Sequence, residues 1–150
     1  MKDATFIGRY FYNLSINTGA KYKEYFIEGK EPPLKLKLMF WICNQLVLKN
    51  IKKLLGLNNC RYALSGAAPI SPELINWYLS LGIDMREGWG MTETAGVGTA
   101  YYSREIKLGH VGRAVNNSEV RIADDGEILF KGPGVFCGYL NKPEQTNETL

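Results

Sequence analysis

The stretch RYALSGAAPISPELINWYLSLGIDMREGWGMTET, from Arg61 to Thr94, decides the fold. It opens with a short run, Arg61 to Leu64, that predicts a buried strand leading into a loop of small residues. Ser71-Pro72 then predicts the start of a helix, because serine is a favoured N-cap and proline suits the first helical position. The helix ends by Gly82, and a second strand runs from Ile83 to Glu87. Strand, helix and strand in this order predict a parallel α/β unit, in which ligands gather at the carboxyl ends of the strands.

The residues before this unit predict helices. From Ala4 to Leu57 apolar side chains recur at three- and four-residue spacing, and Glu31-Pro32-Pro33 divides the stretch into two helical parts. The second part, Leu34 to Leu57, interleaves lysines with large apolar residues and is therefore a basic amphipathic stretch. Such a stretch can lie on an anionic membrane surface, but packing of its apolar face on the protein is the simpler interpretation.

The residues after the unit predict antiparallel β-structure. Glu119 to Ala123 and Glu127 to Lys131 flank Asp124-Asp125-Gly126, a connection that favours a β-hairpin. With the glycines that follow, Lys107 to Tyr139 predicts a small antiparallel unit that does not continue the parallel sheet. The predicted fold class is therefore α/β with a β-rich C-terminal part.

Composition and the histidine count exclude several function classes. The 150 residues are 45% hydrophobic and 22% charged, which supplies a core and argues against disorder. His110 is the single histidine, so two-histidine metal sites are excluded within these residues and histidine-dependent hydrolases lose support. No alternating basic and aromatic platform for nucleic acid is present in the sequence, so we expect no nucleic-acid partner.

Cysteines and apolar runs indicate the compartment. Cys43, Cys60 and Cys137 are far apart and odd in number, which favours a reducing, cytoplasmic setting over a disulfide framework. The longest apolar stretch, Leu36 to Leu48, has about 13 residues and falls short of the roughly 20 that span a bilayer. We therefore expect a cytoplasmic protein that contacts membranes, if at all, at their surface.

The loop after the second strand carries residues suited to a nucleotide. Gly88 and Gly90 let the backbone approach a flat ligand, and Trp89 between them offers a face for stacking. Thr92 and Glu93 follow with a hydroxyl for a phosphate and a carboxylate for magnesium, which is commonly held by one or two carboxylates plus phosphate oxygens. An equally strong interpretation is a tight turn, with Trp89 in the core and Glu93 at the start of a helix.

The small residues from Ser65 to Pro69 follow the first strand. They would give a shallow floor on which a purine lies against backbone, because bulky side chains would fill that space. Such residues also make ordinary strand-to-helix connections, which is the default interpretation when the loop is taken alone.

Four segments, taken together, resemble the adenylate-forming acyl-CoA synthetases. They are, in order, SGAAPIS from Ser65, EGWGMTET from Glu87, KLGHVGR from Lys107 and DGEILFKGPGVFCGY from Asp125. The first two segments are most similar to those of long-chain fatty acid:CoA ligases, including the bubblegum type. The resemblance covers Leu55 to Leu150 well and the helical start more loosely.

The resemblance implies that the chain is an internal part of a large N-terminal domain. Residues 1–57 would be a helical insertion segment, residues 58–106 an α/β adenylate-binding part, and residues 107–150 the start of a β subdomain. The implied reaction uses ATP and Mg²⁺ to activate a fatty acid as acyl-AMP, and then transfers the acyl group to CoA as a thioester. Fatty acid, ATP and CoA are the expected partners.

The resemblance also implies roles for particular residues. The adenine would be bordered by the first loop and the end of the second strand, that is by Ser65, Gly66, Ala67, Ala68, Glu87, Gly88 and Trp89. Thr92 would bind the AMP phosphate and Glu93 would coordinate magnesium, and these two are the expected catalytic residues. Trp89 stands where the family often has tyrosine, so stacking would remain but a phenol hydroxyl contact would not.

Some parts of the family pattern are not found in these 150 residues. Met1 to Asn50 contains no Ser/Thr/Gly-rich phosphate loop with a lysine, and no Thr-Gly-Asp segment or C-terminal catalytic lysine is recognised up to Leu150. We therefore expect little or no synthetase activity from the chain alone. Alternatives are a truncated non-catalytic paralogue, a membrane-surface binding module, or an adenylating enzyme for another carboxylic acid.

Overall fold

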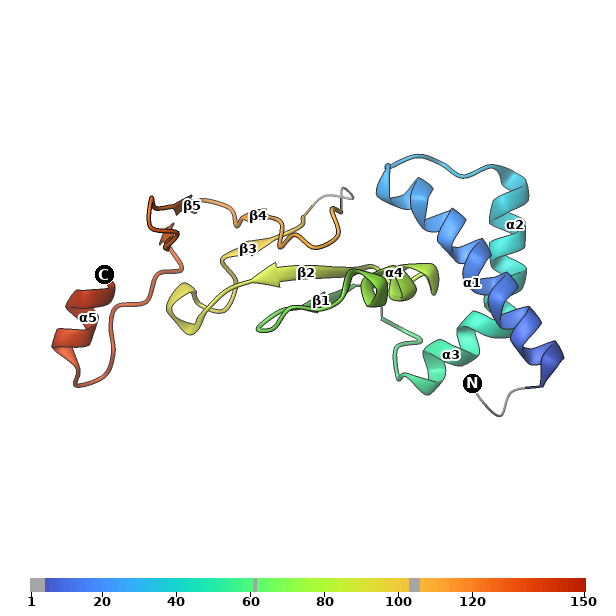
Figure 1. The fold of residues 1–150 in the computed structure, drawn as a ribbon, viewed down its shortest axis with the longest axis horizontal. Coiled ribbons are helices and arrows are strands. Elements are labelled where there is room, and N and C mark those ends of the chain that lie inside the picture. The colour runs from blue at the N-terminus through green and yellow to red at the C-terminus, as the bar shows by residue number, and fades with distance from the viewer. Residues whose placement is uncertain (1–4, 61, 103–105) are drawn as a thin grey trace.

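The computed structural model describes residues 5–60, 62–102 and 106–150 (Figure 1). In chain order the elements are α1 (Phe6–Ile27), α2 (Leu34–Cys43), the π-helical turn η1 (Asn44–Leu48), α3 (Lys49–Leu54), β1 (Ala63–Ser65), α4 (Pro72–Ser80), β2 (Met85–Trp89), the 3₁₀ turn η2 (Thr92–Thr94), β3 (Thr99–Ala100), β4 (Arg113–Ala114), β5 (Glu119–Ile122), β6 (Ile128–Lys131) and α5 (Pro143–Thr149). Figure 1 shows the first helices at one end of an elongated molecule, the sheet in the middle, and α5 at the other end. The prediction of an α/β fold with a β-rich C-terminal part is confirmed.

The predicted parallel unit is present as β1, α4 and β2. The two strands pair in parallel with Ala63 opposite Met85 and Ser65 opposite Glu87. Helix α4 begins as predicted, because the Ser71 side chain accepts a hydrogen bond from the backbone N–H of Leu74, 3.2 Å away, and Pro72 takes the first helical position. The crossover through α4 brings the carboxyl ends of both strands to one edge of the sheet.

Two details of this unit differ from the prediction. The first strand is not fully buried, because the Leu64 side chain is 45% exposed, and Arg61 lies outside the described residues. The second strand begins at Met85 and not at Ile83, because the chain leaves α4 through Gly82 in the left-handed region (φ 80°). Ile83 instead packs into the hydrophobic core with Leu81.

Strands β3 and β4 extend the sheet on the other side of β2. β2 pairs antiparallel with β3, and β3 pairs antiparallel with β4, so the strand order in this sheet is β1-β2-β3-β4. β5 and β6 form the separate hairpin that the sequence predicts, with Gly126 in the left-handed region of the turn (φ 91°). The prediction that Lys107 to Tyr139 does not continue the parallel sheet is therefore wrong for β4, which joins that sheet because β3 offers it an antiparallel partner. The division of the chain into three parts stays a prediction.

The helical part is interrupted where the two prolines predict it. α2 continues through the π-helical turn η1 into α3 without a loop. Cys43 and Leu48 are both buried although they are five residues apart, a spacing that the wider π turn places on one face.

Helices α1 and α4 pack with their backbones close together at Gly19. A Cβ added to Gly19 would lie 1.8 Å from the carbonyl oxygen of Ser80, so only glycine fits there.

The basic amphipathic stretch is only partly buried. Cys43 and Leu48 belong to the core, whereas Leu34, Leu38 and Trp41 on α2 are 83%, 57% and 59% exposed. Across the described residues, no helix is both long and apolar enough to cross a membrane.

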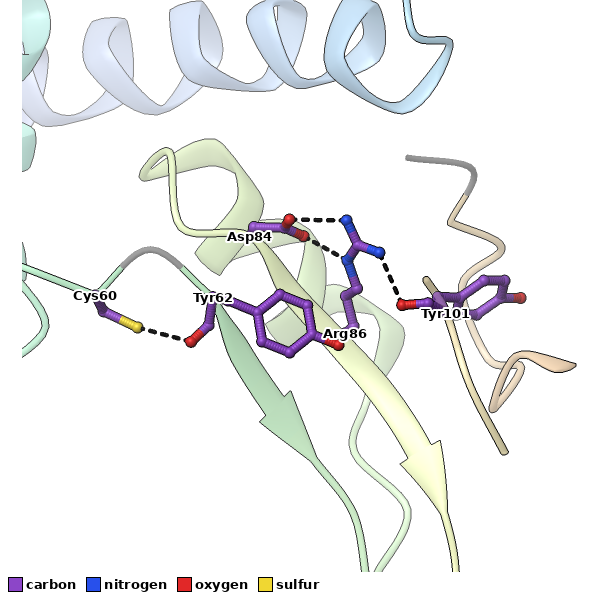
Figure 2. A network of polar contacts seen from close by, with 5 residues as sticks. All are labelled: Cys60, Tyr62, Asp84, Arg86 and Tyr101. Carbon is purple, nitrogen blue, oxygen red and sulfur yellow. Dashed lines mark hydrogen bonds and ion pairs between the residues drawn. The ribbon is translucent and has the colours of Figure 1, made fainter. Parts of the chain in front are cut away.

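A buried arginine on β2 connects the central strands (Figure 2). Arg86 is 5% exposed and forms a two-point ion pair with Asp84, in which Nε and the second guanidinium nitrogen each donate to one carboxylate oxygen at 2.7 and 2.8 Å. Its remaining nitrogen donates to the backbone oxygen of Tyr101, just after β3, at 2.8 Å. The Tyr62 ring, just before β1, lies 5.2 Å from the guanidinium carbon. Arg86 therefore joins the strands on both sides of β2.

Removal of this guanidinium should destabilise the sheet. Arg86→Met leaves the Asp84 carboxylate without its buried partner, and we expect the free energy of unfolding to fall by about 3 kcal/mol in urea denaturation. Lys37→Met is the matched control, because it removes a lysine whose ion pair with Glu31 is exposed, and it should leave the urea midpoint unchanged. Equal midpoints for the two variants would contradict a central role for Arg86.

Candidate functional site

The residues predicted to border a purine lie side by side at the carboxyl ends of β1 and β2. Ser65 is the register partner of Glu87, so their side chains share one face of the sheet. Trp89 follows two residues later in β2 and, by strand alternation, points to that same face. The structure thus brings together the two predicted loops, which are more than twenty residues apart in sequence.

Close backbone approach explains the small residues at this edge. A Cβ added to Gly66 would lie 3.1 Å from the carbonyl oxygen of Gly88, and one added to Gly88 would lie 3.0 Å from the carbonyl oxygen of Thr99. The left-handed backbone conformation falls on Ala67 (φ 66°) and not on Gly66, so Gly66 is required for space. Because Gly66, Ala67 and Ala68 are exposed, they form a ledge of backbone and methyl groups.

Trp89 packs against the protein and is only partly exposed. A Cβ added to Gly98 would lie 2.7 Å from the indole ring and 3.4 Å from the Phe130 ring of β6. The indole therefore rests on the backbone of Gly98, beside the β5–β6 hairpin. This packing agrees with the interpretation of the loop as a tight turn. Part of the Trp89 ring is still accessible, so the ring can also contact a ligand.

The loop that follows β2 is closed by hydrogen bonds. The N–H of Gly98 donates to the carbonyl oxygen of Trp89, and the N–H of Gly96 donates to that of Met91, both at 2.8 Å. The Thr94 hydroxyl accepts from the N–H of Met91 at 2.9 Å and donates to the Met91 carbonyl oxygen at 3.1 Å. Thr94 is 3% exposed, so this hydroxyl serves the loop and not the solvent. The loop holds Thr92 and Glu93 in a fixed 3₁₀ turn, in which Thr92 is exposed.

Glu93 is held by the segment that follows β6. The Tyr139 hydroxyl donates a hydrogen bond of 2.6 Å to Oε1 of Glu93, and the N–H of Phe136 donates one of 2.9 Å to its backbone oxygen. The bond from Tyr139, followed by one from the residue's own backbone, lowers the pKa of Glu93 from its ordinary value. The same bond raises the pKa of Tyr139. Glu93 is therefore a carboxylate at neutral pH.

A hollow of about 520 Å³ lies beside this loop. Its walls include Met91, Glu93 and Thr94 on one side and Phe130 and Lys131 of β6 on the other. The ledge residues do not line it, so the predicted site residues fall into two neighbouring groups, one at the strand ends and one around Glu93.

Glu93 is the candidate metal ligand that the sequence predicts, and Glu127 lines the same hollow. Among the residues that the structure describes, no three His, Cys, Asp or Glu side chains are grouped closely enough to hold a metal ion. Magnesium in nucleotide sites needs only one or two carboxylates, because phosphate and water oxygens complete its shell. The hydrogen bond from Tyr139 uses Oε1, so Oε2 lies outside that bond and suits a cation bound together with a phosphate.

Sequence reasoning missed two residues of this site, Thr94 and Tyr139. Thr94 has a local signal, because a hydroxyl three residues after Met91 can cap the turn that begins there. Tyr139 has none, because 46 residues separate it from Glu93 and its contact depends on the path of the chain.

Loss of the Thr94 hydroxyl should loosen the loop. Thr94→Ala leaves the N–H of Met91 without its acceptor, which costs about 1–2 kcal/mol, and hydrogen exchange of the Met91 and Gly96 amides should become faster. Thr94→Ser keeps the hydroxyl and should retain slow exchange. If the two variants exchange at the same rate, the hydroxyl does not close the loop.

The chain matches known proteins over most of its length. The sequence profile of the family described as AMP-binding enzyme matches residues 15–140. The chain is 38% identical over 119 residues to a protein of Mycobacterium bovis named long-chain-fatty-acid–CoA ligase FadD15, covering 79% of this chain and 20% of that protein. It is 35% identical over 130 residues to a Xenopus laevis protein named long-chain-fatty-acid–CoA ligase ACSBG2, covering 83% of this chain and 17% of the relative.

A solved structure shares the fold. The o-succinylbenzoate coenzyme A synthetase of Bacillus subtilis, solved in complex with ATP and magnesium ion, superposes with a TM-score of 0.54 at 26% identity, covering 67% of this chain and 24% of that one. The chain spans about a fifth of the length of the curated relatives. Since the profile match extends over far more than half of the 150 residues and includes both strand-end loops, the chain belongs to the family of AMP-binding enzymes.

Proposed function

We propose that this chain forms the adenylate-binding part of an ATP-dependent long-chain fatty acid:CoA ligase. The observation that carries the proposal is the meeting of Ser65 and the Gly66–Ala68 ledge with Glu87–Trp89 at the carboxyl ends of two parallel strands. Family membership supports an adenylate ligand, and the names of the two relatives support a long-chain acid.

The proposed reaction has two steps. The fatty acid carboxylate attacks the α-phosphorus of ATP, which gives acyl-AMP and releases pyrophosphate. The CoA thiol then attacks the acyl carbon, which forms the thioester and releases AMP. Magnesium, when bound, would supply positive charge to the phosphate oxygens.

Each group of site residues has a proposed role in these steps. The ledge accepts the adenine ring, which lies on backbone because Gly66 and Ala67 carry almost no side chain. The exposed part of Trp89 packs at the edge of that ring. Thr92 is exposed at the start of its 3₁₀ turn and donates its hydroxyl to the AMP phosphate. Glu93, a carboxylate at neutral pH, holds the cation near the phosphate.

The class of acid is proposed from the names of the relatives. Two relatives at 38% and 35% identity are named for long-chain fatty acids, whereas the B. subtilis structure at 26% identity is a synthetase for o-succinylbenzoate. The greater identity favours a long alkyl chain over an aryl acid. A benzoyl ligand is therefore the informative competitor in a binding experiment.

Binding of a stable acyl-adenylate tests the proposal. We expect isothermal titration of the purified chain with palmitoyl sulfamoyl-adenosine to show saturable binding that is tighter than binding of the benzoyl compound. Ala68→Phe fills the ledge and should weaken binding at least about tenfold, since adenine loses its backbone contact. Ala123→Phe, in the hairpin turn and away from the ledge, should bind as the wild type does.

Three outcomes would contradict parts of this function. A folded wild-type chain that binds neither adenylate lacks the proposed site. Equal affinity of Ala68→Phe and wild type would show that the adenylate binds somewhere other than the ledge. Tighter binding of the benzoyl compound would keep the adenylate site but change the acid to an aryl acid.

Contact with an anionic membrane surface is a second candidate function. It is favoured by α2, where Lys35 and Lys37 alternate with the exposed apolar residues Leu34, Leu38 and Trp41. The sequence from Leu34 to Pro72 contains no Asp or Glu, so every charged side chain within it is basic, and Glu31 just before it pairs with Lys37. Exposed apolar residues with surrounding lysines are typical of helices that lie at a bilayer interface.

Vesicle co-sedimentation tests this contact. We expect the chain to sediment with phosphatidylglycerol vesicles and not with phosphatidylcholine vesicles, because each exposed lysine contributes about 1 kcal/mol near an anionic surface. Replacing Lys35, Lys37 and Lys53 by glutamine should abolish sedimentation. The matched control replaces three exposed lysines outside the helices, Lys107, Lys131 and Lys142, and should sediment normally. Equal loss in both triple variants would indicate general charge attraction without a defined surface.

A further inference from the structure

Tyr139 and Phe136 fix Glu93 at two points. The phenol hydroxyl bonds Oε1 of the carboxylate at 2.6 Å, and the Phe136 N–H bonds the backbone oxygen of the same residue at 2.9 Å. Gly134, in the same segment, approaches the loop closely, since a Cβ added there would lie 3.2 Å from the carbonyl oxygen of Thr94. The segment after β6 therefore holds both the backbone and the side chain of Glu93.

Tyr139 is itself held in place by its neighbours. Its N–H donates to the hydroxyl of Thr146 on α5 at 2.9 Å, and that hydroxyl donates to the Lys142 carbonyl oxygen at 2.9 Å. Its ring packs edge-on against Phe136, with ring centres 4.7 Å apart. Gly138 lets α5 approach, because a Cβ there would lie 2.7 Å from the Thr146 methyl carbon. The phenol is thus oriented before any ligand arrives.

A glutamate side chain turns about several single bonds, and a ligand must otherwise restrict that freedom when it binds. We propose that Tyr139 is a positioning residue, whose hydroxyl holds the Glu93 carboxylate so that Oε2 faces a Mg²⁺–phosphate group. This inference rests on the proposed role of Glu93 in the adenylate site. It adds a residue from the segment after β6 to a site otherwise formed by β1, β2 and the loop after β2. It assigns Tyr139 no contact with the nucleotide.

The test compares Tyr139→Phe, which keeps the ring and removes the hydroxyl, with Tyr102→Phe, which removes the hydroxyl of an exposed tyrosine. The first readout needs no ligand: NMR relaxation of the Glu93 side chain in the free chain should show greater mobility in Tyr139→Phe only. The second readout is the Mg²⁺ concentration for half-maximal binding of β,γ-methylene-ATP. It should rise about tenfold in Tyr139→Phe, as expected when a residue that supports a metal ligand is lost.

Further measurements separate positioning from folding. Binding of palmitoyl sulfamoyl-adenosine without metal and the urea midpoint should stay as in the wild type in Tyr139→Phe. In a Glu93→Gln background the added Tyr139→Phe change should have no further effect on the Mg²⁺ dependence, because the two side chains act as one unit.

Each other result overturns the inference. Unchanged Glu93 mobility would show that the hydroxyl does not restrict the carboxylate. Equal losses of metal-free adenylate binding and of Mg²⁺ affinity would show that Tyr139 supports only the fold. Binding of β,γ-methylene-ATP by the wild-type chain without any Mg²⁺ dependence would refute the positioning role and leave the adenylate site intact. Absence of binding of both β,γ-methylene-ATP and palmitoyl sulfamoyl-adenosine would refute the proposed function itself.

Discussion

The buried guanidinium of Arg86 is the interaction on which the rest of the structure depends. It lies on β2, pairs with Asp84 before the strand, bonds the backbone at Tyr101 and contacts the Tyr62 ring. A buried arginine needs all of its donors satisfied, because an unpaired charge in the interior is strongly unfavourable. Three pieces of chain must therefore meet around β2. The far end of the same strand carries Glu87 to Trp89, so the arginine fixes the frame from which the ledge and the Glu93 loop extend.

Close backbone contacts then shape the site within this frame. Gly66, Gly88 and Gly98 each occupy a place where a Cβ would press on a carbonyl oxygen or on the Trp89 ring. Gly88 and Gly98 are buried and let neighbouring segments pack closely, whereas Gly66 is exposed and, with Ala67 and Ala68, leaves accessible backbone that suits a flat ligand. The segment after β6 closes the other side by holding Glu93 through Tyr139 and Phe136. Rigid backbone on one side and a fixed carboxylate on the other are consistent with the adenylate role proposed for the chain.

Strong local signals made part of this structure predictable. Helix α4 begins at the cap predicted from Ser71-Pro72, and the β5–β6 hairpin turns where Asp124-Asp125-Gly126 predicts it. Both predictions hold because caps and turns depend on residues close in sequence. β3 and β4 were not predicted, since strands of two residues have no periodicity and exist only because β2 offers them partners. The π-helical turn was also missed, because its wider winding follows from burying both Cys43 and Leu48.

By itself, the sequence determined the parallel βαβ unit, the small-residue loops at its strand ends and the likeness to an adenylate-forming family. These features reside in neighbouring residues, whose propensities and motifs act over a few positions. Tertiary structure alone decided three contacts. Arg86 donates a hydrogen bond to the backbone of Tyr101, Trp89 packs on Gly98, and Tyr139 donates a hydrogen bond to Glu93, 46 residues away in sequence. Such contacts depend on where the chain path brings distant side chains together, and no local pattern encodes that path.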